Sequence, residues 1–318
     1  MKNIILVGLS AIYLFTTGAY ASKINKANLN PNQEAIVREL KNPDSSYFAE
    51  DSIDAVVLAG RNPVLDWGTD YEAILDINDK PMICYVVEAL AESDYINNIY
   101  IVGEEDKLNK IDFSVEKEIK IVNGTGKYLD DFVNGGNASE TEKILYSTCD
   151  IPLIEKVHID GFIEDCAEKG EADLYLPYCI EEEDKRKFPE IETRYVLEFP
   201  IGGNSRTAYI LLLNRYCLDK VNKNKDIKKI IASLDSTREE RIKIYEDIVK
   251  RNLSLRLLKL YIRYKRGTLT VDEAGEFLSK LTRKNIVLIK SSSEIGTNIK
   301  SRKDLENIEE IMIKKSEN

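Results

Sequence analysis

The strongest constraint on the fold is an alternation of apolar, β-branched runs with helix-like segments between Asp54 and Ile180. Strands that are buried on both faces of a parallel sheet have continuous apolar runs of this kind. The pattern therefore predicts a mostly parallel sheet that is covered by helices. The expected strands are 54–59, 98–102, 119–122, 144–146 and 172–179, and the expected helices are 81–92 and 155–169.

The alternation stops after Ile180. Residues 215–282 are helical in pattern almost throughout, which indicates a helical insertion towards the C-terminus. We expect one domain over residues 51–318 with this insertion inside it. The other elements expected after Ile180 are a charged loop at 181–187, strands at 195–199 and 286–289, an apolar stretch at 208–213 and a closing helix at 303–315.

The first 21 residues differ from the rest of the chain. An apolar run at 4–15 follows Lys2, and Ala19-Tyr20-Ala21 has the small-x-small form of a signal-peptidase site. A cleaved signal peptide would export the protein to the periplasm or the medium. The run is also just long enough for an uncleaved membrane anchor, which leaves the side of the membrane open, the cytosolic face included. Residues 22–50 are polar and are expected to form a linker.

The charge balance limits the class of partner. A formal net charge of −10 argues against a general nucleic-acid binder, because phosphate contacts need clustered Lys and Arg. Residues 237–267 form a basic window in this acidic chain. A basic amphipathic helix at 253–266 could contact an anionic membrane surface or cover a phosphorylated substrate. The alternative is a helix that is packed by its leucines and has a solvated basic face.

The five cysteines are widely spaced and include no CxxC pair, which excludes a disulfide framework and a zinc site. Most lie in apolar patterns, where Cys packs as a small hydrophobic residue. Cys149 could have a local role because it precedes Asp150, but packing is the favoured interpretation. The only histidine, His158, lies in a helical pattern and is expected to be structural. No Ser/His/Asp grouping indicates a hydrolase.

Asp150 directly follows a buried strand, and Pro152 and a helix come after it. Ligands of parallel α/β sheets bind just beyond the carboxyl ends of the strands. A carboxylate at such a place can hold a divalent metal against a phosphate chain. The alternative is that Asp150 only caps the following helix.

Three separated pieces of the chain occur in a characteristic order. They are 56–60 with 71–75 and 79–82, then 147–153, then 294–299 with 303–305. Together they resemble the MobA-like NTP transferases over roughly residues 53–310. The resemblance implies a GT-A or Rossmann-like three-layer α/β sandwich. It also implies transfer of a nucleotidyl group from a nucleoside triphosphate to a small phosphorylated acceptor, with release of pyrophosphate.

The resemblance implies roles for individual residues as well. Chemistry of this type depends on positioning and charge neutralisation, so Mg²⁺ is the expected cofactor. Asp150 matches the metal-binding Asp of the family, and Asn298 lies where the family commonly has a second carboxylate. The nucleotide-binding candidates are Leu58, Ala59, Gly60 and Arg61, the substrate-binding candidates are Gly202, Gly203 and Asn204, and Lys80 joins Asp150 as a catalytic candidate.

Two positions depart from the family pattern. Gly60 is followed by Arg61-Asn62-Pro63 where the family has a second glycine, and the proline stiffens this turn. Glu72 stands where the family usually has a lysine that reaches the phosphates, so an anion replaces a cation beside a triphosphate. Arg61 or Lys80 could supply the missing positive charge. Glu72 itself could be a catalytic base, a solvated carboxylate or the mark of a lost site.

These departures leave two alternatives open. A degenerate paralogue would keep the fold and bind a ligand or partner without catalysis, and an export signal favours it because free NTP is scarce outside the cytosol. A GT-A glycosyltransferase would use Asp150 with a nucleotide sugar, although the loop of Asp150 carries no second carboxylate nearby. The Gly202–Asn204 segment could be only a tight turn.

Overall fold

The computed structural model describes part of the chain. The described residues are 53–60, 71–191, 197–199, 203–221, 243, 258–260, 262–263, 266, 268–282 and 284–316. The predicted signal or anchor segment, the predicted linker and most of the predicted helical insertion and basic window lie outside them. Among the described residues no helix is both long enough and apolar enough to cross a membrane.

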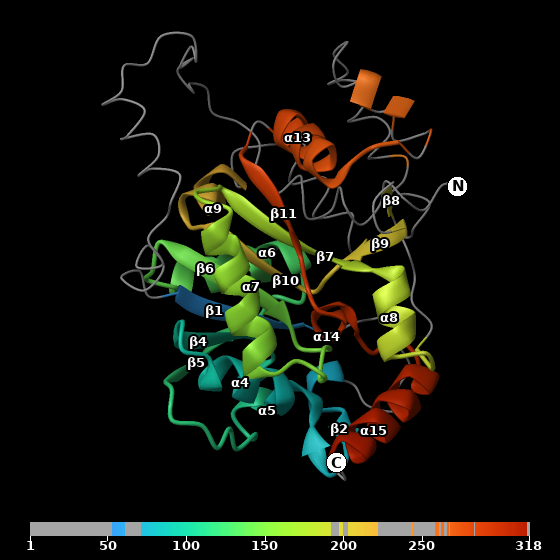
Figure 1. Cartoon of the computed structure of the whole chain (residues 1–318). Coiled ribbons are helices and arrows are strands. Elements are labelled where there is room, and N and C mark those ends of the chain that lie inside the picture. Colours follow the sequence, from blue (N-terminus) through green and yellow to red (C-terminus); the bar gives the residue numbers. More distant parts are fainter. Residues whose placement is uncertain are drawn as a thin grey trace.

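The centre of the molecule is a nine-stranded sheet with the order β5-β4-β1-β6-β10-β7-β9-β8, in which β11 also pairs with β7 (Figure 1). Only β9 and β10 run against the other described strands of this sheet, so it is mostly parallel, as predicted. The strands are β1 (Ile53–Ala59), β4 (Ile96–Gly103), β5 (Ile119–Asn123), β6 (Lys143–Thr148), β7 (Leu174–Ile180), β8 (Leu197–Phe199), β9 (Gly203–Thr207), β10 (Ile210–Asn214) and β11 (Ile286–Lys290). A separate hairpin joins β2 (Asp76–Ile77) to β3 (Lys80–Pro81).

Helices cover both faces of the sheet. The described helices are α4 (Met82–Glu92), α5 (Glu105–Leu108), α6 (Tyr128–Ala138), α7 (Lys156–Glu168), α8 (Glu181–Lys187), α9 (Tyr216–Val221), α13 (Val271–Thr282), α14 (Ser293–Gly296) and α15 (Arg302–Ser316), with a 3₁₀ turn, η2, at Glu72–Ile74. Figure 1 shows α4 and α7 together on one face of the sheet.

Strand β1 divides the two hydrophobic cores. Its side chains point alternately to opposite faces. Ala55 and Val57 pack with α4, α7 and α15, whereas Val56 and Leu58 pack with α6, α9 and α13. All seven residues of the strand are buried, which is why it is a continuous apolar run. The predicted three-layer sandwich is therefore confirmed.

Most predicted elements end within two residues of the observed ones. The charged loop predicted at 181–187 is wrong, because this segment forms α8. Its four acidic residues lie in the first turn and its basic residues in the last, an arrangement that stabilises a helix through its dipole. The helix α6 was not predicted. It buries Phe132 and also carries two buried glycines, Gly135 and Gly136, which make it a poor match to a helical pattern.

Candidate functional site

The carboxyl ends of β1, β4 and β6 lie side by side. Leu58 of β1 is paired with Thr148 of β6, and Ala59 is paired with Gly103 of β4. The Cys149 N–H then donates a hydrogen bond to the Leu58 carbonyl oxygen at 3.3 Å. Asp150 therefore follows β6 next to the point where β1 ends. This is the edge of a parallel sheet at which ligands bind.

Asp150 does not cap the following helix. The N-cap of α7 is Glu155, whose side chain forms a capping box with His158. Asp150 is half-buried, and Thr148 Oγ1 donates to its Oδ1. The structure thus excludes the capping alternative for Asp150.

Asn298 reaches Asp150 across a long stretch of chain. Its Nδ2 donates to Asp150 Oδ2 at 2.7 Å, and the Ile299 N–H donates to the Asp150 carbonyl oxygen at 3.0 Å. The two residues predicted to hold a metal are therefore in contact. In the orientation observed the amide presents its NH₂ group to the carboxylate, so it must turn over before its oxygen can ligate a cation.

Glu72, in η2, is buried rather than solvated. Its side chain is 9% exposed, and its Oε1 has no hydrogen-bond partner within the described part of the chain. Burial and the negative charge of Asp150 raise the pKa of this carboxyl to about 8, although Lys300 opposes the shift. The solvated interpretation of Glu72 is therefore wrong. The residue is a second acidic group close to Asp150.

Lys300 supplies positive charge beside these two carboxyls. Its Nζ bonds the Tyr209 hydroxyl at 2.7 Å and lies 4.9 Å from the centre of the Tyr209 ring. Tyr209 is fixed at the end of β6, because its carbonyl oxygen accepts a hydrogen bond from the Thr148 N–H at 3.1 Å. Neither Tyr209 contact neutralises the ammonium, and Lys300 is exposed. The sequence analysis missed Lys300, although its position two residues after Asn298 was a usable signal.

Lys80 lies in a different electrostatic environment. Its Nζ forms an ion pair with Glu88 of α4 and lies 4.2 Å from the centre of the Tyr85 ring. A carboxylate therefore already balances its charge. The catalytic role of Lys80 stays a prediction, and these contacts do not bring it to Asp150.

The predicted nucleotide-binding residues lie at the end of β1. Leu58 and Ala59 are buried, so only their backbone and Gly60 can face a ligand there. Packing at this point is close, since a Cβ on Gly103 would lie 2.1 Å from the Tyr71 hydroxyl and 2.7 Å from the Ala59 oxygen. Arg61 lies outside the described residues.

Asp131 is a further buried carboxylate at this edge. Its Oδ1 accepts hydrogen bonds from the Thr125 N–H and hydroxyl at 2.6 and 2.9 Å, and its Oδ2 would lie 3.7 Å from a Cβ on Gly60. The sequence analysis did not single it out, because nothing in the local pattern separates it from Asp130.

The predicted substrate-binding segment lies farther along the sheet. Gly203 and Asn204 open β9 and pair with Phe199 and Glu198 of β8, while Gly202 lies outside the described residues. This antiparallel pairing is compatible with a tight turn between β8 and β9, so the turn alternative stays open. The substrate-binding role of the segment stays a prediction.

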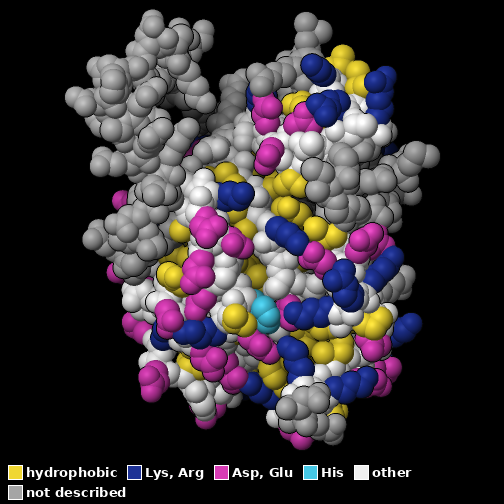
Figure 2. Space-filling model, in the orientation of Figure 1, with side chains coloured by type: hydrophobic (Ala, Val, Ile, Leu, Met, Phe, Trp, Pro, Cys, Tyr) yellow, Lys and Arg dark blue, Asp and Glu magenta, His cyan; other side chains and the backbone are white. Residues whose placement is uncertain are grey.

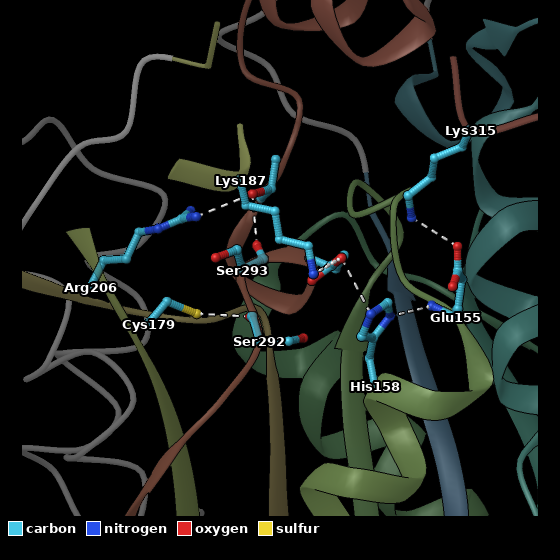
Figure 3. A network of polar contacts seen from close by, with 10 residues as sticks. Glu155, His158, Cys179, Lys187, Arg206, Ser292, Ser293 and Lys315 are labelled. Carbon is cyan, nitrogen blue, oxygen red and sulfur yellow. Dashed lines mark hydrogen bonds and ion pairs between the residues drawn. The ribbon is translucent and has the colours of Figure 1, made fainter. Parts of the chain in front are cut away.

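Arg206 connects β9 to the loop that carries Asn298. Its Nε donates to Asp184 Oδ2 at 2.7 Å. Its Nη2 donates to Thr297 Oγ1 at 3.1 Å, the one dashed line that leaves Arg206 in Figure 3. Thr297 Oγ1 in turn donates to the Ser293 carbonyl oxygen at 2.7 Å. Arg206 and Asp184 are both buried. The ion pair therefore fixes the residue that precedes Asn298.

Glu294 extends this network towards α7. His158 and Lys187, both labelled in Figure 3, contact its carboxylate. Burial alone would raise the pKa of Glu294, but the hydrogen bonds from His158 and Lys187 outweigh it and lower the pKa to about 2. His158 Nδ1 accepts a hydrogen bond from the Glu155 N–H at 3.0 Å, so its other nitrogen carries the proton that faces Glu294. These contacts fit the structural role predicted for His158.

The cysteines, the other acidic residues and the charged surface add no further metal or partner site among the described residues. All five cysteines are buried and free, as predicted, and burial raises the pKa of Cys149 well above its usual value. Within the described ranges no group of three or more His, Cys, Asp or Glu side chains could hold a metal. Acidic and basic side chains are interspersed over the face in Figure 2. This face therefore carries no broad basic patch among the residues described.

A family model for the MobA-like NTP transferase domain matches residues 55–234, more than half of the chain. The chain belongs to the MobA-like NTP transferase family. Its enzyme class is therefore nucleotidyltransferase, and nucleotidyl transfer is the general activity of the class. No curated protein matches the sequence significantly.

Solved structures of low sequence identity share the fold. A hypothetical transferase from Thermus thermophilus is 19% identical with a TM-score of 0.62, over 80% of this chain and 99% of that one. A CMP:2-keto-3-deoxy-manno-octonic acid synthetase complexed with CTP is 12% identical with a TM-score of 0.53, over 83% and 99%. A 4-diphosphocytidyl-2C-methyl-D-erythritol synthase from Anaerococcus prevotii is 9% identical with a TM-score of 0.52, over 84% and 99%.

Proposed function

We propose that the protein transfers a nucleotidyl group from a nucleoside triphosphate to a small phosphorylated acceptor, with Mg²⁺ as cofactor and pyrophosphate as the leaving group. The observation that carries this proposal is the convergence of Asp150, Asn298 and Lys300 at the common carboxyl edge of β1 and β6. A carboxylate for a metal, and an ammonium that no carboxylate among the described residues neutralises, are the two charges that such a transfer needs.

Each residue at this edge would have a separate role that follows from its chemistry. Asp150 would hold Mg²⁺, which supplies charge neutralisation at the phosphates when it is bound. Lys300 would bind a phosphate oxygen, because the neutral hydroxyl of Tyr209 positions its ammonium without cancelling the charge. The backbone at Gly60 would allow a close approach of the triphosphate. An acceptor oxygen then attacks the α-phosphorus, the bond from this phosphorus to the bridging oxygen breaks, and pyrophosphate leaves.

The number and type of donor groups at this edge fit Mg²⁺. Protein sites for Mg²⁺ usually supply one or two carboxylates and leave the remaining positions to substrate phosphates and water. A cage of three acidic groups is therefore not required. Asp150 with the orphaned buried oxygen of Glu72 matches this donor set.

The direct test is calorimetry of the full chain with Mg²⁺ and each nucleoside triphosphate, followed by pyrophosphate release with a panel of phosphorylated acceptors. CTP is the first nucleotide to try, because one structurally similar synthetase is complexed with CTP and another is named for a diphosphocytidyl product. We expect Asp150→Ala and Lys300→Met each to reduce pyrophosphate release about 100-fold.

The matched control for Lys300→Met is Lys80→Met. Both lysines lie over a tyrosine ring, but only the ammonium of Lys80 is neutralised by a carboxylate. The control should keep its activity within about twofold. An absence of nucleotide binding by the unmodified chain, or equal losses in the two lysine variants, would overturn the proposal.

A second candidate is a binding protein of the same fold that no longer catalyses transfer. The observation that favours it is Glu72, an anion at the position of the phosphate-binding lysine of the family. This candidate predicts calorimetric binding of a nucleotide or nucleotide sugar with no pyrophosphate release for any acceptor. Release of a free nucleoside diphosphate from a nucleotide sugar would instead support a glycosyltransferase.

A further inference from the structure

Thr148 is the last residue of β6, and its side chain makes a contact that the strand itself does not require. Its backbone pairs with Leu58 of β1, and its N–H donates to the Tyr209 carbonyl oxygen at 3.1 Å. Any residue except proline could make these backbone contacts. The Thr148 hydroxyl, in contrast, donates to Oδ1 of Asp150. A hydroxyl at this position therefore serves the carboxylate and not the sheet.

The second oxygen of Asp150 is held from another part of the chain. Asn298, which is 9% exposed, donates from its Nδ2 to Asp150 Oδ2 at 2.7 Å. The Ile299 N–H donates to the Asp150 carbonyl oxygen at 3.0 Å, so the backbones of the two segments are also joined. An ionised carboxylate can only accept hydrogen bonds, and both neighbours present donors to it. Each oxygen of this carboxylate thus has one donor from the protein.

These contacts differ from those of a structural carboxylate. Asp184 is bound by the guanidinium of Arg206, which balances its charge. The two donors to Asp150 are a neutral hydroxyl and a neutral amide, so they orient the carboxylate without balancing its charge. A carboxylate has roughly four lone-pair sites, and two donors leave a site on each oxygen. Carboxylates that bind metals are typically hydrogen-bonded in this way by neighbouring side chains.

We propose that Thr148 is a positioning residue for the divalent cation. Its hydroxyl holds one oxygen of Asp150 while the Asn298 amide holds the other, so the carboxylate is oriented before the cation binds. Asn298 then acts as a hydrogen-bond donor to the metal ligand and is not itself a ligand. The proposal rests on the proposed function, because the cation is the Mg²⁺ of that reaction.

The test measures binding of Mn²⁺ alone to the full chain, by electron paramagnetic resonance of the free ion. Mn²⁺ prefers the same oxygen ligands as Mg²⁺. The variants are Thr148→Val, Thr148→Ala, Thr148→Ser and Asp150→Asn. Valine keeps the size and the β-branch of threonine and suits a strand, alanine removes the hydroxyl with a smaller side chain, and serine keeps the hydroxyl. Thermal melts monitored by circular dichroism establish that each variant is folded.

The matched control is Thr141→Val, which removes a threonine hydroxyl beside the opposite end of β6. Thr141 Oγ1 donates to the Lys143 carbonyl oxygen at 2.8 Å and accepts a hydrogen bond from the Asp54 N–H at 3.0 Å. This variant therefore loses hydrogen bonds that hold the strand but none to Asp150. Its melting temperature should fall, and its Mn²⁺ affinity should stay within about twofold of the unmodified chain.

We expect Thr148→Val and Thr148→Ala to weaken Mn²⁺ binding about tenfold, and Asp150→Asn to weaken it at least as much. Thr148→Ser should stay within about threefold of the unmodified chain, because the donor is retained. In assays of pyrophosphate release, Thr148→Val should need about tenfold more Mg²⁺ for half-maximal rate, with most of the rate regained at saturating Mg²⁺.

Three results would overturn this inference. One is unchanged Mn²⁺ affinity in Thr148→Val alongside a loss in Asp150→Asn, which would leave the proposed function standing. Another is an equal loss in Thr148→Val and Thr141→Val, which would trace the effect to the stability of β6. The third is a loss in Thr148→Ser as large as that in Thr148→Val, because the hydroxyl would then not be responsible. Failure of the proposed function has a different signature, which is no nucleotide binding by the unmodified chain at any Mg²⁺ concentration.

Discussion

Glu72 and Glu294 are both almost fully buried acids with one buried oxygen that has no hydrogen-bond partner among the described residues, yet the pKa values of their carboxyls shift in opposite directions. Glu294 receives contacts from His158 and Lys187, and the pKa of its carboxyl is lowered to about 2. For Glu72, burial and the negative charge of Asp150 raise the pKa to about 8. The difference teaches that burial alone does not mark a functional acid. What separates the two acids is the cationic or hydrogen-bonding partners that Glu294 has and that compensate its charge.

The region around Glu294 connects secondary structure elements. Arg206 of β9, Asp184 of α8 and Thr297 after α14 are joined by hydrogen bonds within one buried network. Around Glu72 the described residues leave the Oε1 oxygen without a hydrogen-bond partner, and the charge of Asp150 acts against ionisation of this carboxyl. Substitutions should therefore affect mainly folding stability in the first region and mainly ligand binding in the second.

The largest effect on stability is expected for Arg206→Met. It removes the only partner that the Asp184 carboxylate has among the described residues; this side chain is 0% exposed, so the free energy of unfolding should fall by about 3 to 5 kcal/mol. Urea denaturation measures this change. The double variant Arg206→Met/Asp184→Leu should regain most of the loss, because no charge is left buried. A loss below about 1 kcal/mol in the single variant would show that the network is not structural.

Glu72→Gln should increase the free energy of unfolding instead of lowering it. In the folded chain the Glu72 carboxyl titrates at about 8 instead of 4.5, so folding retains a proton that the unfolded chain releases. Stability from this group is present below about pH 4.5 and is lost as the pH rises through 8. The glutamine variant lacks this loss, and should be about 2 to 3 kcal/mol more stable than the unmodified chain at pH 9.

The measurement for Glu72→Gln is urea denaturation at pH 5, 7 and 9 in the presence of a chelator. The stability gain should grow with pH over this range. A gain that does not depend on pH would contradict the assignment of the raised pKa to Glu72.

Glu294→Gln should destabilise the protein by about 2 kcal/mol at pH 7, because it weakens two charge-assisted hydrogen bonds. The folded pKa of Glu294 is depressed from 4.5 to about 2. Its contribution is therefore present above about pH 4.5 and is lost as the pH falls towards 2. Acid titration followed by circular dichroism should show a weaker pH dependence in this range for the variant. An identical acid transition would exclude Glu294 as its source.

The smallest effect is expected for Lys80→Met. The Lys80–Glu88 pair is partly exposed, and pairs of this kind contribute less than about 1 kcal/mol. Nucleotide affinity should also stay within about twofold of the unmodified chain, since the ammonium is already neutralised. Calorimetry with CTP and Mg²⁺ measures this affinity. A large loss would restore Lys80 as the cation that replaces the family lysine.

Local periodicity predicted the elements whose side chains are buried in a regular pattern. The continuous apolar run of β1 predicted a central strand, because both faces of that strand are covered. The same logic failed for α8, where charges at the two ends stabilise a helix that has only one buried residue, Asp184. It also failed for α6, whose glycines allow close packing but weaken the helical signal.

The sequence by itself determined the order of strands and helices, the strand end that carries Asp150, and the family resemblance that pairs Asp150 with Asn298. These depend on local patterns and on motif order, which are properties of the linear chain. Only the tertiary structure decided that Glu72 is buried, with its pKa raised in part by the charge of Asp150, and that Lys80 is paired with a carboxylate whereas Lys300 has no such pair among the described residues. The physical reason is that burial and charge balance depend on which residues, distant in sequence, pack around a side chain, and no local pattern encodes that environment.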